Sequence, residues 1–241
     1  MNLDIAQRRT AHAFLFPLIL FILLAAVLSG CAATSPGVAT QGEPSHDGLL
    51  PLEGTRAQRV WVRPGFDLSG YTKVMLKGAG IQYRPVKPTA SNSTIRGSQT
   101  EFALSEKSKA DLERLITEEF DKALDKLTRF EEVKTPGPDV LLVRGAFLDV
   151  VSRVPPDRPG RTQYYLDSVG QATFMVELID SQSDAVLLRA VDTRAAQSPG
   201  YVYQSNRVTN AAEARRLFAR WASMLVEALN ELTSLDTLNA E

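Results

Sequence analysis

The sequence predicts an α/β (α+β) fold, a two-layer sandwich in which two amphipathic helices cover one mostly antiparallel, mixed sheet of four to five strands. Three observations lead to this class. Apolar residues recur at helical spacing in two segments and alternate with polar residues in several others. These segments follow one another in the order β-β-α-β-β-β-α. Helices gathered on one face of an antiparallel sheet are typical of this class.

The first half of the domain contains two strands and a helix. Residues 59–62 (RVWV) predict a short strand, and residues 71–83 alternate over a longer one. Between residues 105 and 128, apolar side chains fall at the spacing of one helix face. Ser108 followed by Asp111 resembles a capping box, which would start that helix.

The second half contains three strands and a closing helix. Residues 139–150, 170–180 and 185–194 alternate, and the last two predict a hairpin over a polar turn. The closing helix is predicted to begin near Asn210, with Glu213 as its capping partner. The first helix can serve as a crossover that makes the strands before and after it parallel.

The N-terminus predicts a lipoprotein signal peptide over residues 1–30. Arg8 and Arg9 supply a positive start, and the apolar run at 14–27 is about fourteen residues long, whereas a spanning helix needs about 20. The run ends in Leu-Ser-Gly followed by Cys31, a sequence that resembles a bacterial lipobox. We therefore expect cleavage before Cys31 and its acylation, which anchors the protein in a membrane.

The residue after the cysteine bears on which membrane that is. The chain resembles Gram-negative lipoproteins, and in their sorting rule an Asp at this position retains the protein in the inner membrane. Here the position holds Ala32, so we expect the outer membrane, with the domain facing the periplasm. Residues 31–57 are rich in Gly, Pro, Ser and Thr and are expected to form the lipidated cysteine and a flexible tether, followed by a single globular domain over 58–241.

Four segments carry a resemblance to a known family. They are VWVRPGFDLSGYTKVMLKGAGIQYRP, PGPDVLLVRGAFLDV, VGQATFMVELIDSQSDAVLLRAVDTRA and the RWA of the closing helix. In this order, and with a lipobox upstream, the chain resembles the bacterial lipoprotein family known as domain of unknown function 3313 over roughly residues 58 to 235. The resemblance implies a location and a fold, and it supplies no substrate and no catalytic residue.

Composition excludes several function classes. A formal net charge of −1 gives no broad basic field, so nucleic acid is not an expected partner. One cysteine rules out an intramolecular disulfide framework and thiolate metal clusters. Of the two histidines, His12 lies in the signal peptide and His46 in the tether, so no histidine-based triad or metal site is expected. No cofactor and no catalytic residue are therefore predicted.

Two functions remain open. The favoured one is a non-enzymatic outer-membrane lipoprotein that binds or scaffolds another component of the cell envelope. The alternative is a hydrolase that acts on envelope glycan through carboxylates, with Asp149, Asp180 and Asp192 as candidates. It requires two of these aspartates to face one cleft. Their positions at strand ends and turns favour a structural role instead.

The loop at 152–168 is a candidate binding surface. Guanidinium groups suit phosphates and carboxylates, and aromatic rings suit sugars or a protein partner. The loop interleaves such residues with prolines: Arg153, Arg158, Arg161, Tyr164 and Tyr165.

A second candidate surface is the sheet face that two helices leave uncovered. Alternation places Met175 and Leu187 on it, together with the charged trio Arg144, Glu177 and Arg189. The trio favours a cross-strand charge row, and the alternative is an anion-binding site. Such apolar side chains beside charged ones predict docking of an envelope protein or a second copy of the chain. The alternative is that the loops at 152–168 and 193–208 fold over this face.

Overall fold

The protein is described by a computed structural model over residues 43–86, 101–156, 163–197 and 202–231. All of these residues lie in the second of two units, Val38–Glu241. The first unit, Met1–Gly37, lies outside the described residues, and so do the predicted signal peptide and Cys31.

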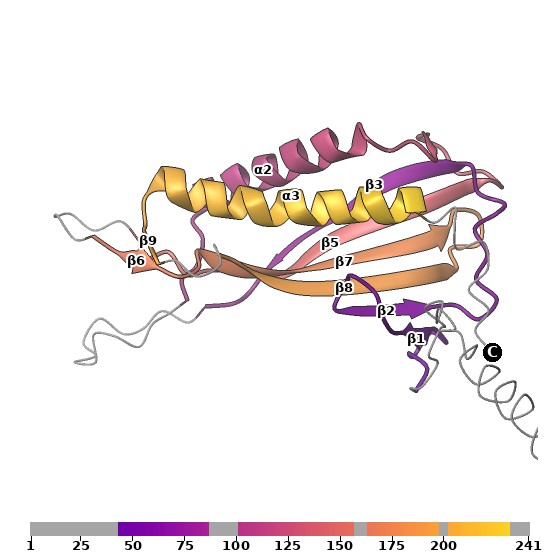
Figure 1. The fold of residues 1–241 in the computed structure, drawn as a ribbon, viewed down its shortest axis with the longest axis horizontal. Helices are drawn as coiled ribbons and strands as arrows, with labels where there is room; N and C mark the ends of the chain where they lie inside the picture. The colour runs from indigo at the N-terminus through magenta and orange to yellow at the C-terminus, as the bar shows by residue number, and fades with distance from the viewer. Residues whose placement is uncertain (1–42, 87–100, 157–162, 198–201, 232–241) are drawn as a thin grey trace, which may run out of the picture. The chain divides into compact units, whose positions relative to one another are not determined.

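A seven-stranded sheet with the order β1-β2-β8-β7-β5-β3-β4 forms one layer of this unit (Figure 1). All of its pairings are antiparallel except those of β3, which runs parallel to both β4 and β5. A separate two-stranded sheet pairs β6 with β9. The strands are β1 (Leu50–Leu52), β2 (Arg59–Val62), β3 (Lys73–Tyr83), β4 (Glu131–Glu132), β5 (Val140–Ser152), β6 (Tyr165–Leu166), β7 (Gly170–Asp180), β8 (Val186–Ala196) and β9 (Tyr203–Gln204).

The sheet is wider than the four to five strands predicted. The additional strands β1 and β4 contain three and two residues, which is too short for alternation to be visible in the sequence. β4 pairs with β3 only at Lys73 and Val74. The predicted parallel pair around the first helix is confirmed, because β3 and β5 are parallel neighbours.

The folded domain also begins earlier than residue 58. Residues 50–52 of the expected tether form β1, which pairs with β2 in register Leu50↔Val62. The preceding Leu49 is completely buried. The prediction of a tether as far as residue 57 is therefore wrong for its second half, because this apolar segment completes the edge of the sheet.

Both helices begin at a side-chain cap. α2 (Glu106–Leu124) begins after Ser105, whose Oγ accepts a hydrogen bond from the Ser108 amide at 3.2 Å, so the cap lies three residues before the predicted one. α3 (Arg207–Glu231) begins after Asn206, whose Oδ1 accepts from the amides of Val208 and Thr209 at 2.9 and 3.0 Å. No helix within the described ranges has the length and apolar content needed to cross a membrane.

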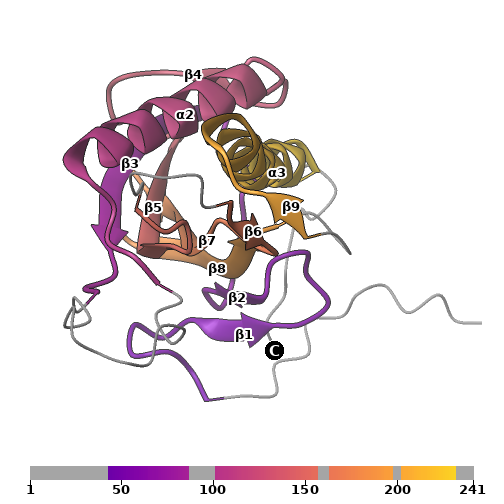
Figure 2. The same cartoon turned by 90° about the vertical axis from the view of Figure 1, so that its left-hand side faces the viewer.

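Both helices lie on the same face of the sheet (Figures 1 and 2). An aromatic cluster fills the space between the two layers, and it consists of Phe120, Phe147, Phe174, Phe218 and Trp221. The Trp221 indole Nε1 donates a hydrogen bond of 2.7 Å to Asp192 Oδ2. This buried bond fixes the position of α3 on β8. If α3 shifted, the indole N–H and the carboxylate would be buried without a hydrogen-bond partner, which costs free energy.

A bulge in β8 changes which side chains face the core. Leu178 pairs with Leu188, but Ile179 pairs with Val186, so Leu187 is the extra residue. Val186 therefore shares the face of Ile179, opposite the helices, whereas Leu187 packs against the core cluster. The prediction that Leu187 lies on the face opposite the helices is wrong, because strict alternation does not allow for this inserted residue.

Candidate functional site

Side chains from six neighbouring strands form one line across the face of the sheet opposite the helices. Directly paired residues point to the same face, so consecutive cross-strand partners stand side by side. We call this line the transverse row; its members are Pro51, Trp61, Arg189, Glu177, Arg144 and Lys77. With strands about 4.8 Å apart, the row is about 24 Å long.

Glu177 is the centre of the row. Its Oε2 accepts hydrogen bonds from Arg144 Nε at 2.9 Å and Nη2 at 2.6 Å, and its Oε1 accepts from Arg189 Nε at 2.8 Å. Only 4% of Glu177 is exposed, and this burial alone would raise the pKa of its carboxyl group. The hydrogen bonds from the two arginines lower that pKa overall, so Glu177 is ionised near neutral pH. The cross-strand charge row predicted from the sequence is confirmed.

Asp47, from the segment before β1, completes the charge pairing of Arg189. Arg189 Nη1 and Nη2 bind the two carboxylate oxygens of Asp47 at 3.2 and 2.7 Å. A turn holds Asp47 in place, in which the Leu49 amide donates to Ser45 Oγ at 3.0 Å. The hydrogen bond from Arg189 lowers the pKa of Asp47 well below its usual range. The N-terminal segment is thus bound to the sheet face at Arg189.

The row and its surroundings carry more positive than negative charge. Arg144 shares the single charge of Glu177 with Arg189, and 41% of its side chain is exposed. Lys77 and Arg59 are exposed, and within the described residues neither forms an ion pair. Four cationic side chains therefore stand against three carboxylates, those of Glu177, Asp47 and Glu53, the last of which lines the neighbouring pocket together with Arg59.

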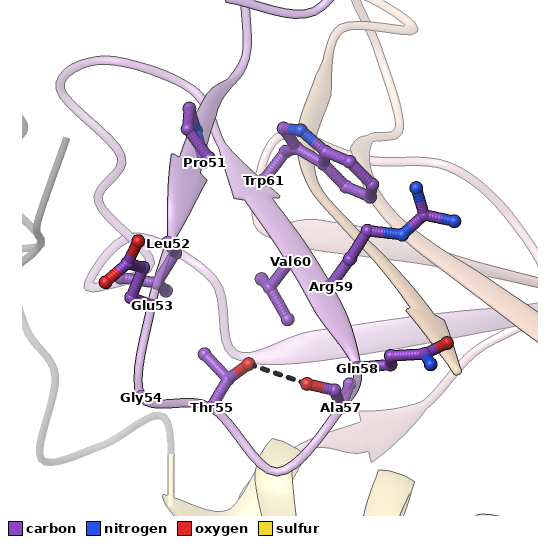
Figure 3. A pocket seen from close by; sticks show the side chains of 10 residues that line it. All are labelled: Pro51, Leu52, Glu53, Gly54, Thr55, Ala57, Gln58, Arg59, Val60 and Trp61. Atoms are coloured by element: carbon purple, nitrogen blue, oxygen red, sulfur yellow. Dashed lines mark hydrogen bonds between the residues drawn. The ribbon is translucent and has the colours of Figure 1, made fainter. Parts of the chain in front are cut away.

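The row ends at a shallow pocket of about 350 Å³ in the β1–β2 hairpin. Arg59 lies beside the Trp61 ring, with 5.7 Å between the guanidinium carbon and the ring centroid (Figure 3). On the opposite side of the pocket, Thr55 Oγ1 donates to the Ala57 carbonyl at 3.0 Å. The complete lining is Pro51, Leu52, Glu53, Gly54, Thr55, Ala57, Gln58, Arg59, Val60 and Trp61.

Sequence reasoning did not identify the Trp61 end of the row. The signal was present, because alternation in Arg-Val-Trp-Val places Arg59 and Trp61 on one face and Val60 and Val62 on the other. What the sequence did not show was that β2 pairs with β8, which brings Trp61 beside Arg189.

The predicted binding loop is described only in part. Arg158 and Arg161 lie outside the described residues, as does Cys31. Arg153 is half-buried and donates its amide to the Val169 carbonyl at 2.8 Å, and Tyr164 is also half-buried. Tyr165 is 62% exposed on β6. The described ranges contain two other exposed large apolar residues, Val202 and Val208. Val202 directly precedes β9, the partner of β6, and Val208 lies in the first turn of α3.

Met175 and Leu187 do not form one surface. Met175 pairs with Ala146 and Val191 on the face opposite the helices and is half-buried there. Leu187 is half-buried against the core. Docking at Met175 remains a prediction, but Leu187 is not part of that surface.

The three candidate aspartates have separate structural partners. Arg84 Nε donates a hydrogen bond of 2.8 Å to Asp149 Oδ1. Asp192 is buried beneath α3, where it accepts the hydrogen bond of the Trp221 indole. Asp180 accepts hydrogen bonds from the Tyr71 hydroxyl and the Ser183 amide, both at 2.7 Å, which lower its pKa to about 2. The hydrogen bond from Arg84 likewise lowers the pKa of Asp149. In the described part of the chain, no three His, Cys, Asp or Glu side chains cluster in a way that could hold a metal ion.

The fold and this face define an α+β protein with a charged sheet surface. The chain belongs to the family described as "Protein of unknown function (DUF3313)", whose model matches residues 40–225. This match confirms the family resemblance seen in the sequence. A comparison with curated proteins finds no match.

Several solved structures are similar to the chain. The PelC dodecamer from Paraburkholderia phytofirmans is 16% identical, with 69% of this chain and 95% of that one covered and a TM-score of 0.31. Protein XCC0632 from Xanthomonas campestris is 14% identical, with 73% and 92% covered and a TM-score of 0.35. A putative neuraminyllactose-binding hemagglutinin homolog from Helicobacter pylori is 8% identical, with 70% and 91% covered and a TM-score of 0.36.

Proposed function

We propose that this protein is a lipid-anchored lipoprotein of the outer membrane that binds or scaffolds another component of the cell envelope without catalysing a reaction. The lipobox-like sequence before Cys31 supports the anchor, and Ala32 supports the outer membrane. The excess of positive charge on the sheet face and the exposed Tyr165 support binding, because Arg59, Lys77 and Tyr165 each present an exposed side chain to a partner.

The placement of the aspartates carries the non-enzymatic part of the proposal. Asp180 pairs with Leu141, whereas Asp149 follows Leu148, the partner of Thr173. Seven residues of β7 separate these two levels, or about 23 Å at the rise of a strand. Asp192 lies on the helix-covered face. Glycoside hydrolases hold their two carboxyl groups roughly 5 to 10 Å apart across the substrate, and neither Asp149 nor Asp180 has a raised pKa that would make it a general acid.

Replacement of the cysteine tests the anchor. We expect Cys31→Ser to release the protein from membranes into the soluble fraction, because two or more acyl chains are needed for stable attachment. The measurement is fractionation followed by a high-salt wash. Matched thermal unfolding of both proteins serves as the control, and we expect no difference, since Cys31 precedes the first strand of the sheet by 19 residues. A Cys31→Ser protein that still sediments with the outer membrane after the wash would contradict a lipid anchor.

A further inference from the structure

We propose that the transverse row and its pocket bind an acidic glycan, that is, a carbohydrate chain that carries carboxylate or phosphate groups. This inference rests on the proposed function and specifies the class of ligand. It depends on three features of the face: an aromatic ring at one end, an excess of cations along its length, and an arginine that already binds a carboxylate.

The aromatic end supplies a surface for a sugar ring. Trp61 is half-exposed and has Pro51 as its neighbour on β1. The apolar faces of sugar rings pack against aromatic rings, while their hydroxyl groups need polar partners at the side. Thr55 and Gln58 line the same pocket and can supply them (Figure 3). At about 350 Å³, the pocket is at the lower end of the range of small-molecule sites.

The cations define the charge of the ligand. Arg59 lies next to Trp61, and Arg144 and Lys77 lie further along the row. A guanidinium group presents a planar fork that matches a carboxylate or a phosphate with two hydrogen bonds. A ligand of the opposite charge would neutralise the excess on this face.

The spacing of the row favours a chain over a small anion. Four strand spacings separate Trp61 on β2 from Lys77 on β3, which is about 19 Å. A single carboxylate or phosphate ion cannot contact both ends, whereas several linked sugars with repeated acidic groups can. Neutral sugars would leave Arg59 and Lys77 without an ion-pair partner among the described residues.

Arg189 provides an example of the expected contact within the protein itself. Its guanidinium group binds both oxygens of Asp47 and is held in place by Glu177. The same carboxylate of Glu177 orients Arg144, which is more exposed. Arg144 is therefore pre-positioned for an anion from outside, as Arg189 is for Asp47.

The two tryptophans of the chain allow a direct test. Trp221 is 1% exposed and serves as an internal reference, whereas Trp61 reports on the pocket. The full chain, solubilised in detergent with labelled indole nitrogens, is titrated by NMR with tetragalacturonate, with uncharged maltotetraose and with tetraglutamate. We expect tetragalacturonate to shift the Trp61 resonance and leave that of Trp221 unchanged, with at least tenfold weaker effects from the other two probes.

Matched variants link the shift to the cations. We expect Arg59→Gln and Arg144→Gln each to weaken tetragalacturonate binding by about tenfold, the effect of losing one charge-assisted hydrogen bond. Arg114→Gln removes the same charge from the exposed face of α2 and should leave the affinity unchanged. An unchanged Trp221 resonance in each variant shows that the fold is intact.

Three results would overturn the assignment. They are a silent Trp61 with tetragalacturonate, an equal response to tetraglutamate, which would indicate an acidic protein segment as the ligand, and equal weakening by Arg114→Gln. If any of these occurs while Cys31→Ser still releases the protein from membranes, the glycan assignment fails and the proposed anchored binding protein stands. Failure of the release experiment would count against the proposed function itself.

Discussion

At the scale of single residues, one carboxylate keeps two arginines side by side. Arg144 and Arg189 flank Glu177 on neighbouring strands, and Asp47 takes the remaining hydrogen-bonding edge of Arg189. The trio could be predicted from alternation, since all three lie at matching positions of long strands. Asp47 could not, because its segment shows no periodicity and its contact with Arg189 joins residues 142 positions apart.

Replacement of Glu177 tests this arrangement. We expect Glu177→Gln to lower the free energy of unfolding by about 3 kcal/mol at pH 7, because the variant leaves two half-buried cations beside each other. Urea unfolding measures the loss. Glu118→Gln is the control, since Glu118 is 45% exposed in its ion pairs on the helix surface and should cost less than about 1 kcal/mol. Equal losses would show that burial of Glu177 contributes nothing.

The same variant has a defined pH dependence. The pKa of Glu177 is lower in the folded protein than its ordinary value of 4.5, so the charge of Glu177 stabilises the fold fully above that value. This contribution is lost as the pH falls through the lower, folded pKa. We therefore expect the difference in stability between wild type and Glu177→Gln to be constant from pH 6 to 8 and to shrink below about pH 4. A constant difference down to pH 3 would contradict this.

At the scale of elements, the segment before β2 belongs to the fold although its sequence resembles a linker. Asp47 binds Arg189, Leu49 is buried, and β1 pairs with β2. Beyond β1, Arg56 forms ion pairs with Glu227 and Glu231 of α3, at 2.9 and 3.1 Å. The segment therefore contacts both the sheet and a helix.

Truncation distinguishes a linker from a structural segment. We expect a chain that starts at Glu43 to unfold at the same temperature as one that starts at Cys31, and a chain that starts at Glu53 to lose several degrees. The loss follows from the burial of Leu49, which alone stabilises by about 2 kcal/mol, and from the ion pair of Asp47. Calorimetry gives the comparison. Equal midpoints for all three chains would mean that residues 43–52 do form a tether.

The elements that could be predicted are those with enough residues to show a period. The helices and the long strands β3, β5, β7 and β8 each cover eleven or more residues, and the sequence indicates all of them. β4, β6 and β9 have two residues each, and only their pairing in three dimensions defines them. The bulge at Leu187 could not be predicted for the same reason, because an inserted residue is visible only against the partner strand.

At the scale of the whole domain, the two candidate surfaces lie far apart. The transverse row crosses β8 at Arg189, whereas β8 reaches the β6–β9 end at Ala196, whose carbonyl accepts from the Val169 amide at 2.9 Å. Seven residues of strand span about 23 Å. A ligand on the row would thus leave Tyr165, Val202 and Val208 free to contact a different molecule, as a scaffold requires.

The short β4 has a consequence for solubility at high concentration. Beyond Lys73 and Val74, no described residue pairs with the outer edge of β3, and an open strand edge is a template for amyloid-like stacking. Lys77 and the bend at Gly80, with φ of +94° beside a register shift, are the features that interrupt such stacking here.

Replacement of Lys77 tests this protection. We expect Lys77→Val to aggregate on storage at lower protein concentration than wild type, as measured by light scattering and thioflavin T fluorescence. Lys122→Val, on the exposed face of α2, should not. Equal behaviour of the two variants would show that the geometry at Gly80 alone protects this edge. The charge of Lys77 would then serve ligand binding and not the prevention of aggregation.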